Sequence, residues 1–268
     1  MGVQPVDLRP ASSLPQGELA ALFTAGYEDY YAPVHIDAAA LAFMTQAWDL
    51  DLDASKVALR DGEPVGVCML GLRGDEAWIG GLGVVVGERR GGLGSRLMEA
   101  VLDEARDRDV REVRLEVIRE NERAIPLYER LGFERTRDLE VWSLPGAPGA
   151  VRETDAGLAH AWIREHRTER EPWQRDDGTL ANLGDLTGLE ADGGAAVVRT
   201  PGGRVLVLQI AGRDGALREL LGAARALGDS LLVLNLPGGH AAGAALRDLG
   251  GRVDVRQYEM AIALQPGG

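Results

Sequence analysis

The chain has 268 residues, 45% of them hydrophobic, and a formal net charge of −13, so its length fits two domains better than one. The acidic balance argues against nucleic acid as a partner, because phosphate contacts need basic patches, and the single cysteine, Cys68, excludes an internal disulfide. The sequence has no apolar run of about eighteen residues and its start does not resemble a signal peptide, so we expect a cytoplasmic protein with no membrane partner.

The first fifty residues are expected to form one strand and two helices. The strand runs from Val3 to Arg9, and apolar spacing predicts helices over 15–31 and 38–48. Asp37 can cap the second helix by accepting a first-turn N–H. The helices carry a group of large side chains: Tyr27, Tyr30, Tyr31, Phe43, Met44 and Trp48. One interpretation of this group is that it belongs to the core.

A hairpin and a glycine-rich strand follow. Asp61-Gly62 predicts a tight turn between strands over 55–60 and 64–72. The next apolar strand begins near residue 77 and contains Gly80, Gly81 and Gly83. Glycines weaken strand pairing, so they indicate a bulge or a close approach by the backbone of a ligand.

The glycine-rich strand leads into a loop that reads Gly-Glu-Arg-Arg-Gly-Gly over residues 87–92. A helix begins directly after it, because apolar residues recur at helical spacing: Leu93, Leu97, Met98, Val101, Leu102 and Ala105. Unpaired N–H groups at the start of a helix, glycines and two arginines together predict an anion site. The alternative interpretation is a solvated basic turn.

A second motif occupies residues 113–133, where a strand with Leu-Glu-Val precedes Asn121, Ala124, Leu127-Tyr128 and Leu-Gly-Phe. Together with the spacing Arg89-x-x-Gly92-x-Gly94, this motif resembles the GNAT superfamily of N-acyltransferases over roughly residues 1–145. The resemblance implies an α/β fold with a mixed, mostly antiparallel central sheet flanked by helices. It also implies that the region of the first two helices forms the acceptor side of a cleft.

The resemblance further implies acetyl-CoA as co-substrate and a set of contacts to it. Loop backbone N–H groups and the two arginines would hold the pyrophosphate. The pantetheine arm would lie along the preceding strand, which is expected to carry both Val84 and Val86, where two central strands splay apart. A backbone N–H near Val84 would polarise the acetyl carbonyl. The implied contact residues are Val84, Val86, Arg89, Arg90, Gly91, Gly92, Gly94, Ser95 and Asn121. Arg90 stands where the family often has glycine.

Two side chains are candidates for proton transfer by the same resemblance. Tyr128 matches the family's general-acid tyrosine, which would protonate the departing sulfur. Glu116 resembles the base of the ribosomal-protein N-terminal acetyltransferases, and Asp75, Glu76 or a water relay are the alternatives. The scattered histidines and lone cysteine predict no metal site.

The second half repeats the plan of the first in a weaker form. We expect a linker at 145–149, a catalytic GNAT-like domain over 1–145 and a degenerate GNAT-like domain over 150–268. The segment 211–215 lacks the Arg-x-x-Gly-x-Gly loop, and the helix predicted over 241–249 has no tyrosine. Each half has a single long strand after its Leu-Gly turn, so we expect the halves, or a partner in a homodimer, to complete each other's sheets.

The sequence therefore predicts an enzyme that transfers the acetyl group of acetyl-CoA directly to a primary amine of a small molecule or peptide. The competing interpretation is a non-catalytic module that binds acyl-CoA and regulates another process. Tyr128 argues against that module, because binding alone needs no general acid.

Overall fold

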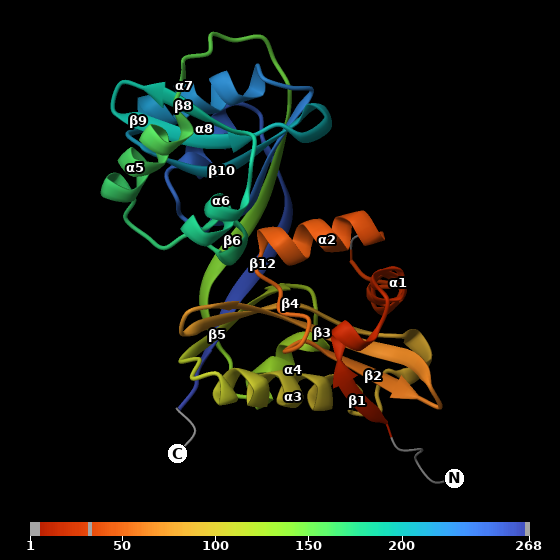
Figure 1. Ribbon diagram of the computed structural model, residues 1–268. Helices are drawn as coiled ribbons and strands as arrows, with labels where there is room; N and C mark the ends of the chain where they lie inside the picture. The colour runs from red at the N-terminus through yellow and green to blue at the C-terminus, as the bar shows by residue number, and fades with distance from the viewer. Residues whose placement is uncertain (1–5, 32–33, 266–268) are drawn as a thin grey trace. The chain divides into compact units, whose positions relative to one another are not determined.

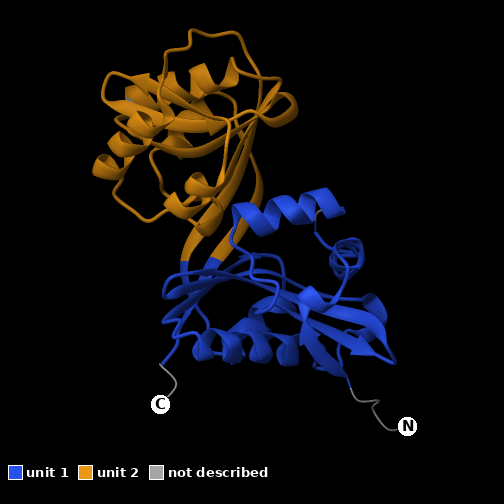
Figure 2. Cartoon of the chain, in the orientation of Figure 1, with its two compact units in different colours: residues 1–136, 259–268 blue, residues 137–258 orange. Residues whose placement is uncertain are grey.

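Twelve strands in the described part of the chain, residues 6–31 and 34–265 of the computed structural model, follow the order β1-β2-β3-β4-β5-β12-β6-β11-β10-β9-β8-β7. The contacts divide the chain into two units (Figure 2). Unit 1 comprises residues 1–136 and 259–268, and unit 2 comprises residues 137–258. Each half of the sequence has the same order of elements: a strand, two α-helices, three strands, and then a helix, a strand, a helix and a last strand, labelled in Figure 1.

Unit 1 contains most of the elements predicted for the first half. Its helices are α1 (Gln16–Gly26), α2 (Ala38–Ala47), α3 (Leu93–Asp107) and α4 (Ala124–Arg130). Its strands are β1 (Asp7–Pro10), β2 (Lys56–Arg60), β3 (Glu63–Arg73), β4 (Glu76–Val84) and β5 (Glu112–Ile118), with the start of β6 (Glu134–Pro145) and the end of β12 (Arg252–Ala263). Helices α3 and α4 cover one face of the sheet and α1 and α2 the other (Figure 1).

Local sequence signals account for several of these boundaries. The Asp37 carboxylate accepts the N–H of Ala40 at 2.7 Å and so caps α2 as predicted. Asp61 and Gly62 have φ of 53° and 87°, the left-handed pair that a two-residue hairpin between β2 and β3 requires. The predicted first strand begins only at Asp7, and its residues 3–5 lie outside the described residues.

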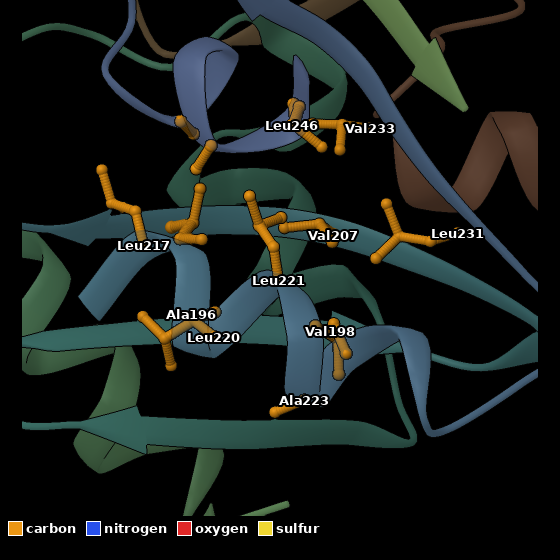
Figure 3. Close-up of a cluster of buried hydrophobic side chains, with 14 of the residues drawn as sticks. Ala196, Val198, Val207, Leu217, Leu220, Leu221, Ala223, Leu231, Val233 and Leu246 are labelled. Atoms are coloured by element: carbon orange, nitrogen blue, oxygen red, sulfur yellow. The ribbon is translucent and has the colours of Figure 1, made fainter. Parts of the chain in front are cut away.

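Unit 2 repeats this plan from different residues. Its helices are α5 (Ala156–His166), α6 (Asp177–Asn182), α7 (Asp214–Arg225) and α8 (Ala242–Asp248). Its strands are β7 (Glu153–Thr154), β8 (Leu186–Ala191), β9 (Gly194–Arg199), β10 (Arg204–Gly212) and β11 (Ser230–Pro237), with the larger parts of β6 and β12. Leu217, Leu220 and Leu221 of α7 pack on Val207 and Leu231 of the sheet (Figure 3).

Strands β6 and β12 are exchanged between the two halves of the sequence. Strand β6 follows the first Leu-Gly turn, yet it pairs antiparallel with β11 and places Trp142 and Leu144 in the core of unit 2. Strand β12 ends the second half, yet it lies next to β5 in the strand order, and the N–H of Leu264 donates to the Arg111 carbonyl at 2.8 Å. The prediction that the halves complete each other's sheets is therefore confirmed.

The compact units consequently follow contacts rather than chain order. The division at 137 and 258 falls inside β6 and β12, whereas the sequence predicts domains over 1–145 and 150–268. That division by sequence stays a prediction about how the two halves of the chain are related.

Both units contain the same junction of two parallel strands. In unit 1 the β4–β5 pairing runs from Glu76–Glu112 to Trp78–Arg114, and in unit 2 the β10–β11 pairing runs from Arg204–Ser230 to Leu206–Leu232. In both units the first strand of the junction also has a register shift against its other neighbour. The β3–β4 register shifts between Met69 and Leu70 of β3, and the β9–β10 register shifts between Val207 and Gln209 of β10. This matching register aligns the two junctions residue by residue.

Candidate active site

The junction of β4 and β5 opens a pocket in unit 1. The ladder between the two strands ends at Trp78 and Arg114, although β4 continues to Val84 and β5 to Ile118. The diverging ends enclose a pocket of about 80 Å³. Its lining residues are Tyr27, Tyr30, Ile79, Gly81, Leu82, Leu115, Glu116, Val117, Asn121, Ala124 and Tyr128. Three of the residues predicted for the site, Glu116, Asn121 and Tyr128, thus lie around one pocket.

The glycines of β4 have two structural roles next to this pocket. Gly80 is the extra residue of a bulge, because Met69 pairs with Gly81 and Leu70 with Ile79. A Cβ on Gly81 would come within 2.6 Å of the Phe23 ring, so glycine lets α1 pack closely on the strand. The predicted bulge is confirmed, and α1 makes the close approach here.

The arginine- and glycine-rich loop forms the start of α3, as predicted. Gly92 is the N-cap with φ of 77°, and a Cβ placed on it would meet no atom within 4 Å. Gly94 and Ser95 lie in the first turn, which contains no acidic residue, so its N–H groups and the helix dipole favour an anion. The Cβ position of Gly94 is 3.5 Å from Leu127 of α4, which brings the loop next to the helix that carries Tyr128.

The two loop arginines differ in what they contact. Arg89 donates from Nε to the Val84 carbonyl at 2.8 Å and from Nη2 to the carbonyls of Gly26 and Glu28 at 3.2 and 2.7 Å. Its guanidinium therefore fastens the loop to the end of β4 and to the C-terminus of α1. Arg90 is exposed and has φ of 72°, a left-handed conformation that explains why glycine would suit this position.

Val84 and Val86 occupy different kinds of backbone. Val84 is the last residue of β4 and pairs with Gly66 of β3. Val86 lies beyond the strand, in a short 3-10 turn over Val86–Glu88, and its side chain is 44% exposed. The expectation that one strand carries both valines is wrong, because the N–H of Val85 bonds to the Val65 carbonyl and the chain turns directly after it.

Tyr128 lies on α4 with its side chain buried against the pocket and 7% exposed. Burial raises the pKa of the Tyr128 phenol well above its ordinary value of 10, and the neighbouring Tyr27 raises it further. Burial also raises the pKa of Tyr27. These phenols stay protonated at neutral pH, which is the form that a general acid needs.

Glu116 and Asn121 are oriented by specific hydrogen bonds. The Glu116 Oε2 accepts the indole N–H of Trp78 at 2.7 Å. The Asn121 Oδ1 accepts the N–H of Ala124 at 3.1 Å, which caps the first turn of α4, and the Asn121 side chain also bonds to the Tyr30 hydroxyl. Asn121 therefore links the segment after α1 to α4 across the pocket.

Three residues of this site, Tyr27, Tyr30 and Trp78, were not predicted from the sequence to line the pocket or to contact Glu116. Tyr27 and Tyr30 line the pocket, and they also line a second pocket of about 430 Å³ at the C-terminus of α1 with Thr24, Ala25, Glu28, Asp29 and Val34. Trp78 contacts Glu116 although 38 residues separate them in the chain. The aromatic group after residue 26 was a signal for the tyrosines, whereas only the strand register could have indicated Trp78.

The corresponding junction of unit 2 lacks each of these features. The matching register puts Leu206 at the place of Trp78 and Leu234 at the place of Glu116. Only Arg213 separates β10 from α7, so the loop is absent there. The junction is filled instead by Arg175, which is 1% exposed and donates to the carbonyls of Leu208 and Leu234 at 2.6 and 3.1 Å.

Comparison with known proteins agrees with this geometry. The model of the acetyltransferase (GNAT) family matches residues 19–133, which hold α3, β4, β5 and α4. This segment is a GNAT acetyltransferase domain. The match supports acyl transfer as the chemistry of this domain. Members of the GNAT family in general use acetyl-CoA and amine acceptors. None of the curated proteins matches the sequence.

Solved structures resemble the chain over both halves. A GCN5-related N-acetyltransferase from Sphaerobacter thermophilus has a TM-score of 0.75 at 18% identity, covering 99% of this chain and 98% of its own. A tandem GNAT protein from the clavulanic acid biosynthesis pathway has a TM-score of 0.65 at 15% identity, covering 98% and 100%. A GCN5-related N-acetyltransferase from Kribbella flavida has a TM-score of 0.57 at 16% identity, covering 97% and 71%. At these identities the likeness shows the fold alone, which is a tandem GNAT arrangement with a mixed, mostly antiparallel sheet.

Among residues 6–31 and 34–265, none of the helices has the length and apolar character needed to cross a membrane. The same part of the chain has no group of three histidine, cysteine or acidic side chains arranged to hold a metal ion. Cys68 is buried, and burial raises the pKa of its thiol, so it is suited to packing rather than to nucleophilic attack.

Proposed function

We propose that the GNAT domain transfers the acetyl group of acetyl-CoA directly to a primary amine of a small molecule or peptide. The observation that carries the proposal is the placement of Glu116, Asn121 and Tyr128 around one pocket, next to the open N-terminus of α3. An anion site beside a pocket with two proton-transfer groups fits a donor with a pyrophosphate at one end and a thioester at the other.

The residues of the loop fit the charged end of acetyl-CoA. Backbone N–H groups of Gly92, Gly94 and Ser95 supply donors without side chains in the way, and the exposed Arg90 adds a full charge. Gly91 leaves room on the same loop, since a Cβ there would be 3.8 Å from its nearest atom. Arg89 contributes by fastening the loop in this conformation.

The pocket residues fit the transfer step. A proton passes from the substrate ammonium to Glu116, the nitrogen attacks the thioester carbon, and the carbon–sulfur bond breaks. Tyr128 gives its proton to the departing sulfur and recovers one from the new amide nitrogen, so no covalent enzyme intermediate forms. A backbone N–H near Val84 is a donor for the carbonyl oxygen.

The wider pocket at the end of α1 suits an amine as the acceptor. Glu28 and Asp29 are acidic, and the rings of Tyr27 and Tyr30 present faces that attract a cation. An ammonium entering there would pass the two tyrosines that also line the reaction pocket.

Calorimetric titration of acetyl-CoA into the full chain tests the proposal. We expect one site per chain and loss of that site in Gly94→Glu, which adds a negative charge in the first turn of α3. Gly222→Glu on α7 is the control for a glycine-to-glutamate change on a helix outside the site, since a Cβ there meets no atom within 4 Å, and it should bind normally. Binding followed by acetylation of members of an amine panel supports the enzyme. Binding without turnover on any amine would support a regulatory acyl-CoA module instead, and absence of binding would overturn both.

A further inference from the structure

The hydrogen bond between Trp78 and Glu116 is an unusual feature for the interior of a sheet. Both residues line or adjoin the opening between β4 and β5, and the Trp78 side chain is buried. Burying a carboxylate in such a place is unfavourable unless it is hydrogen-bonded. The indole N–H, a donor only, supplies a bond of 2.7 Å to Oε2.

The fold itself does not need this pair. Unit 2 builds the same junction with the same register, and there the two positions are held by Leu206 and Leu234. Two leucines therefore satisfy the packing of the junction. The unit that lacks the loop at its helix start also lacks the pair, whereas the unit that has the loop contains both members.

The surroundings of Trp78 fix the direction of its ring. Trp48 packs edge-on against it at 5.7 Å between ring centroids. A Cβ on the bulge residue Gly80 would come within 2.9 Å of the Trp78 ring and 2.7 Å of Leu50, so only glycine leaves room for this ring position. The bulge and Trp48 together aim the indole N–H at Glu116.

We propose that Trp78 is a positioning residue that holds the Glu116 carboxylate ionised and directed into the pocket. This rests on the proposed function, in which Glu116 accepts a proton from the substrate ammonium. Glu116 is half-buried, and it must be ionised before it can act as a base. Partial burial opposes ionisation, and a donor to the charged form favours it. The N–H of Trp78 thus keeps Glu116 ready to act at neutral pH.

Other ionisable groups line the pocket with Glu116 or lie on β4, β5 and β12, and they act on the same equilibrium. The segment after α1 and helix α4 contribute phenols, which are protonated at neutral pH. An arginine and one of its carboxylate partners lie on β5 itself, its other carboxylate partner lies on β4, and one further carboxylate lies on β12. They are Tyr27, Tyr30, Tyr128, Arg114, Glu76, Glu112 and Glu259. All of them remain in place in a Trp78 variant, so a change in the pH profile would report the lost indole donor.

The test compares Trp78→Phe with Trp142→Phe in the full chain. Trp142 is equally buried and its indole N–H also donates to a carboxylate, Glu140, at 3.0 Å, but it lies in unit 2. In Trp78→Phe we expect the acid limb of kcat/KM for the amine to move up by about one pH unit, which is a fall of about tenfold in kcat/KM on that limb, with the KM for acetyl-CoA unchanged. Trp142→Phe should leave the limb where it is in the wild type.

A second variant and a reference variant make the outcome decisive. Gly80→Ala, which displaces the Trp78 ring, should move the limb in the same direction. The inference is overturned if the profiles of Trp78→Phe and Trp142→Phe coincide while Glu116→Gln is inactive. Full activity of Glu116→Gln would instead remove Glu116 as the base, and failure of the wild type to acetylate any amine would remove the proposed function.

Discussion

The buried phenol of Tyr128 gives a prediction about rate. Tyr128→Phe should lower kcat about 100-fold and leave the KM for acetyl-CoA within about threefold, because a general acid acts in the transition state more than in binding. Burial holds the pKa of Tyr128 above 10, so the wild type should lose no rate to its ionisation below that pH. Steady-state rates from pH 6 to pH 10 measure both effects. Tyr258→Phe on β12 is the matched loss of a hydroxyl outside the pocket, and equal rates in the two variants would leave Tyr128 a packing role only.

His240 in unit 2 predicts how stability depends on pH. Burial, with the nearby charge of Arg175, lowers the pKa of His240 to about 4, against about 6.5 in an unfolded chain. Between these values the unfolded chain binds a proton that the folded chain does not. The folded chain therefore has its full stability above about pH 6.5 and loses on the order of 2 kcal/mol as the pH falls towards 4.

His240→Asn separates this contribution from that of other groups. The histidine Nδ1 accepts the N–H of Ala242 at 3.1 Å, and the asparagine side-chain oxygen can accept the same bond. Urea unfolding at several pH values from 4.5 to 7.5 should give a flatter dependence for the variant. Parallel curves for the two proteins would contradict the assignment to His240.

Among the secondary-structure elements, β10 and β11 are bridged by the buried Arg175, which donates to a carbonyl of each strand and forms an ion pair with Glu171. The Nη2 of Arg175 lies 3.1 Å from the Glu171 Oε2, and burial raises the pKa of Glu171 against the opposing charge of Arg175. Arg175→Met should cost about 3–5 kcal/mol of unfolding free energy, because it leaves a buried carboxylate and two strand carbonyls without their donor. Adding Glu171→Leu should recover part of that loss, since the second change removes the stranded carboxylate. Urea unfolding of the wild type, the two single variants and the double variant measures the coupling, and strictly additive costs would refute it.

The sequence predicted elements whose signals are local. Three such features were predicted, because each depends on neighbours within a few residues: the Asp61-Gly62 turn, the Asp37 cap and the apolar face of α3. Strand β8 and helix α6 were not predicted, although Asp192-Gly193 repeats the hairpin signal with a Gly193 φ of 78°. Strand β8 has no alternating apolar pattern, and α6 is only six residues long, so periodicity gave little to detect.

The site was predictable to the extent that its residues belong to motifs. The motif residues Glu116, Asn121 and Tyr128 meet at one pocket, but the contacts that orient them come from elsewhere in the chain. Trp78 reaches Glu116 only through strand register, and the contacts of Arg89 with Gly26 and Glu28 depend on how α1 packs. Long-range packing of this kind leaves no local trace in a sequence.

At the level of the whole chain, the exchange of β6 and β12 predicts that the first half cannot work alone. Deleting residues 150–268 removes the part of β12 that lies beside β5, including the fully buried Met260. It also removes Ile262, whose side chain packs next to Gly132. The deletion also removes β11, the strand that pairs with β6, and exposes Trp142 and Leu144, which residues of the second half bury. An unpaired strand edge next to exposed apolar side chains favours aggregation.

We therefore expect residues 1–149 produced alone to be inactive and to elute as aggregates in size-exclusion chromatography. Co-expression with residues 150–268 should restore a soluble complex of the two fragments and its activity, because each fragment supplies the strand that the other lacks. The full chain under the same conditions is the control for expression and assay. A soluble and active 1–149 fragment would show that the second half is dispensable, and the exchanged strands would then add stability without being required for the site to form.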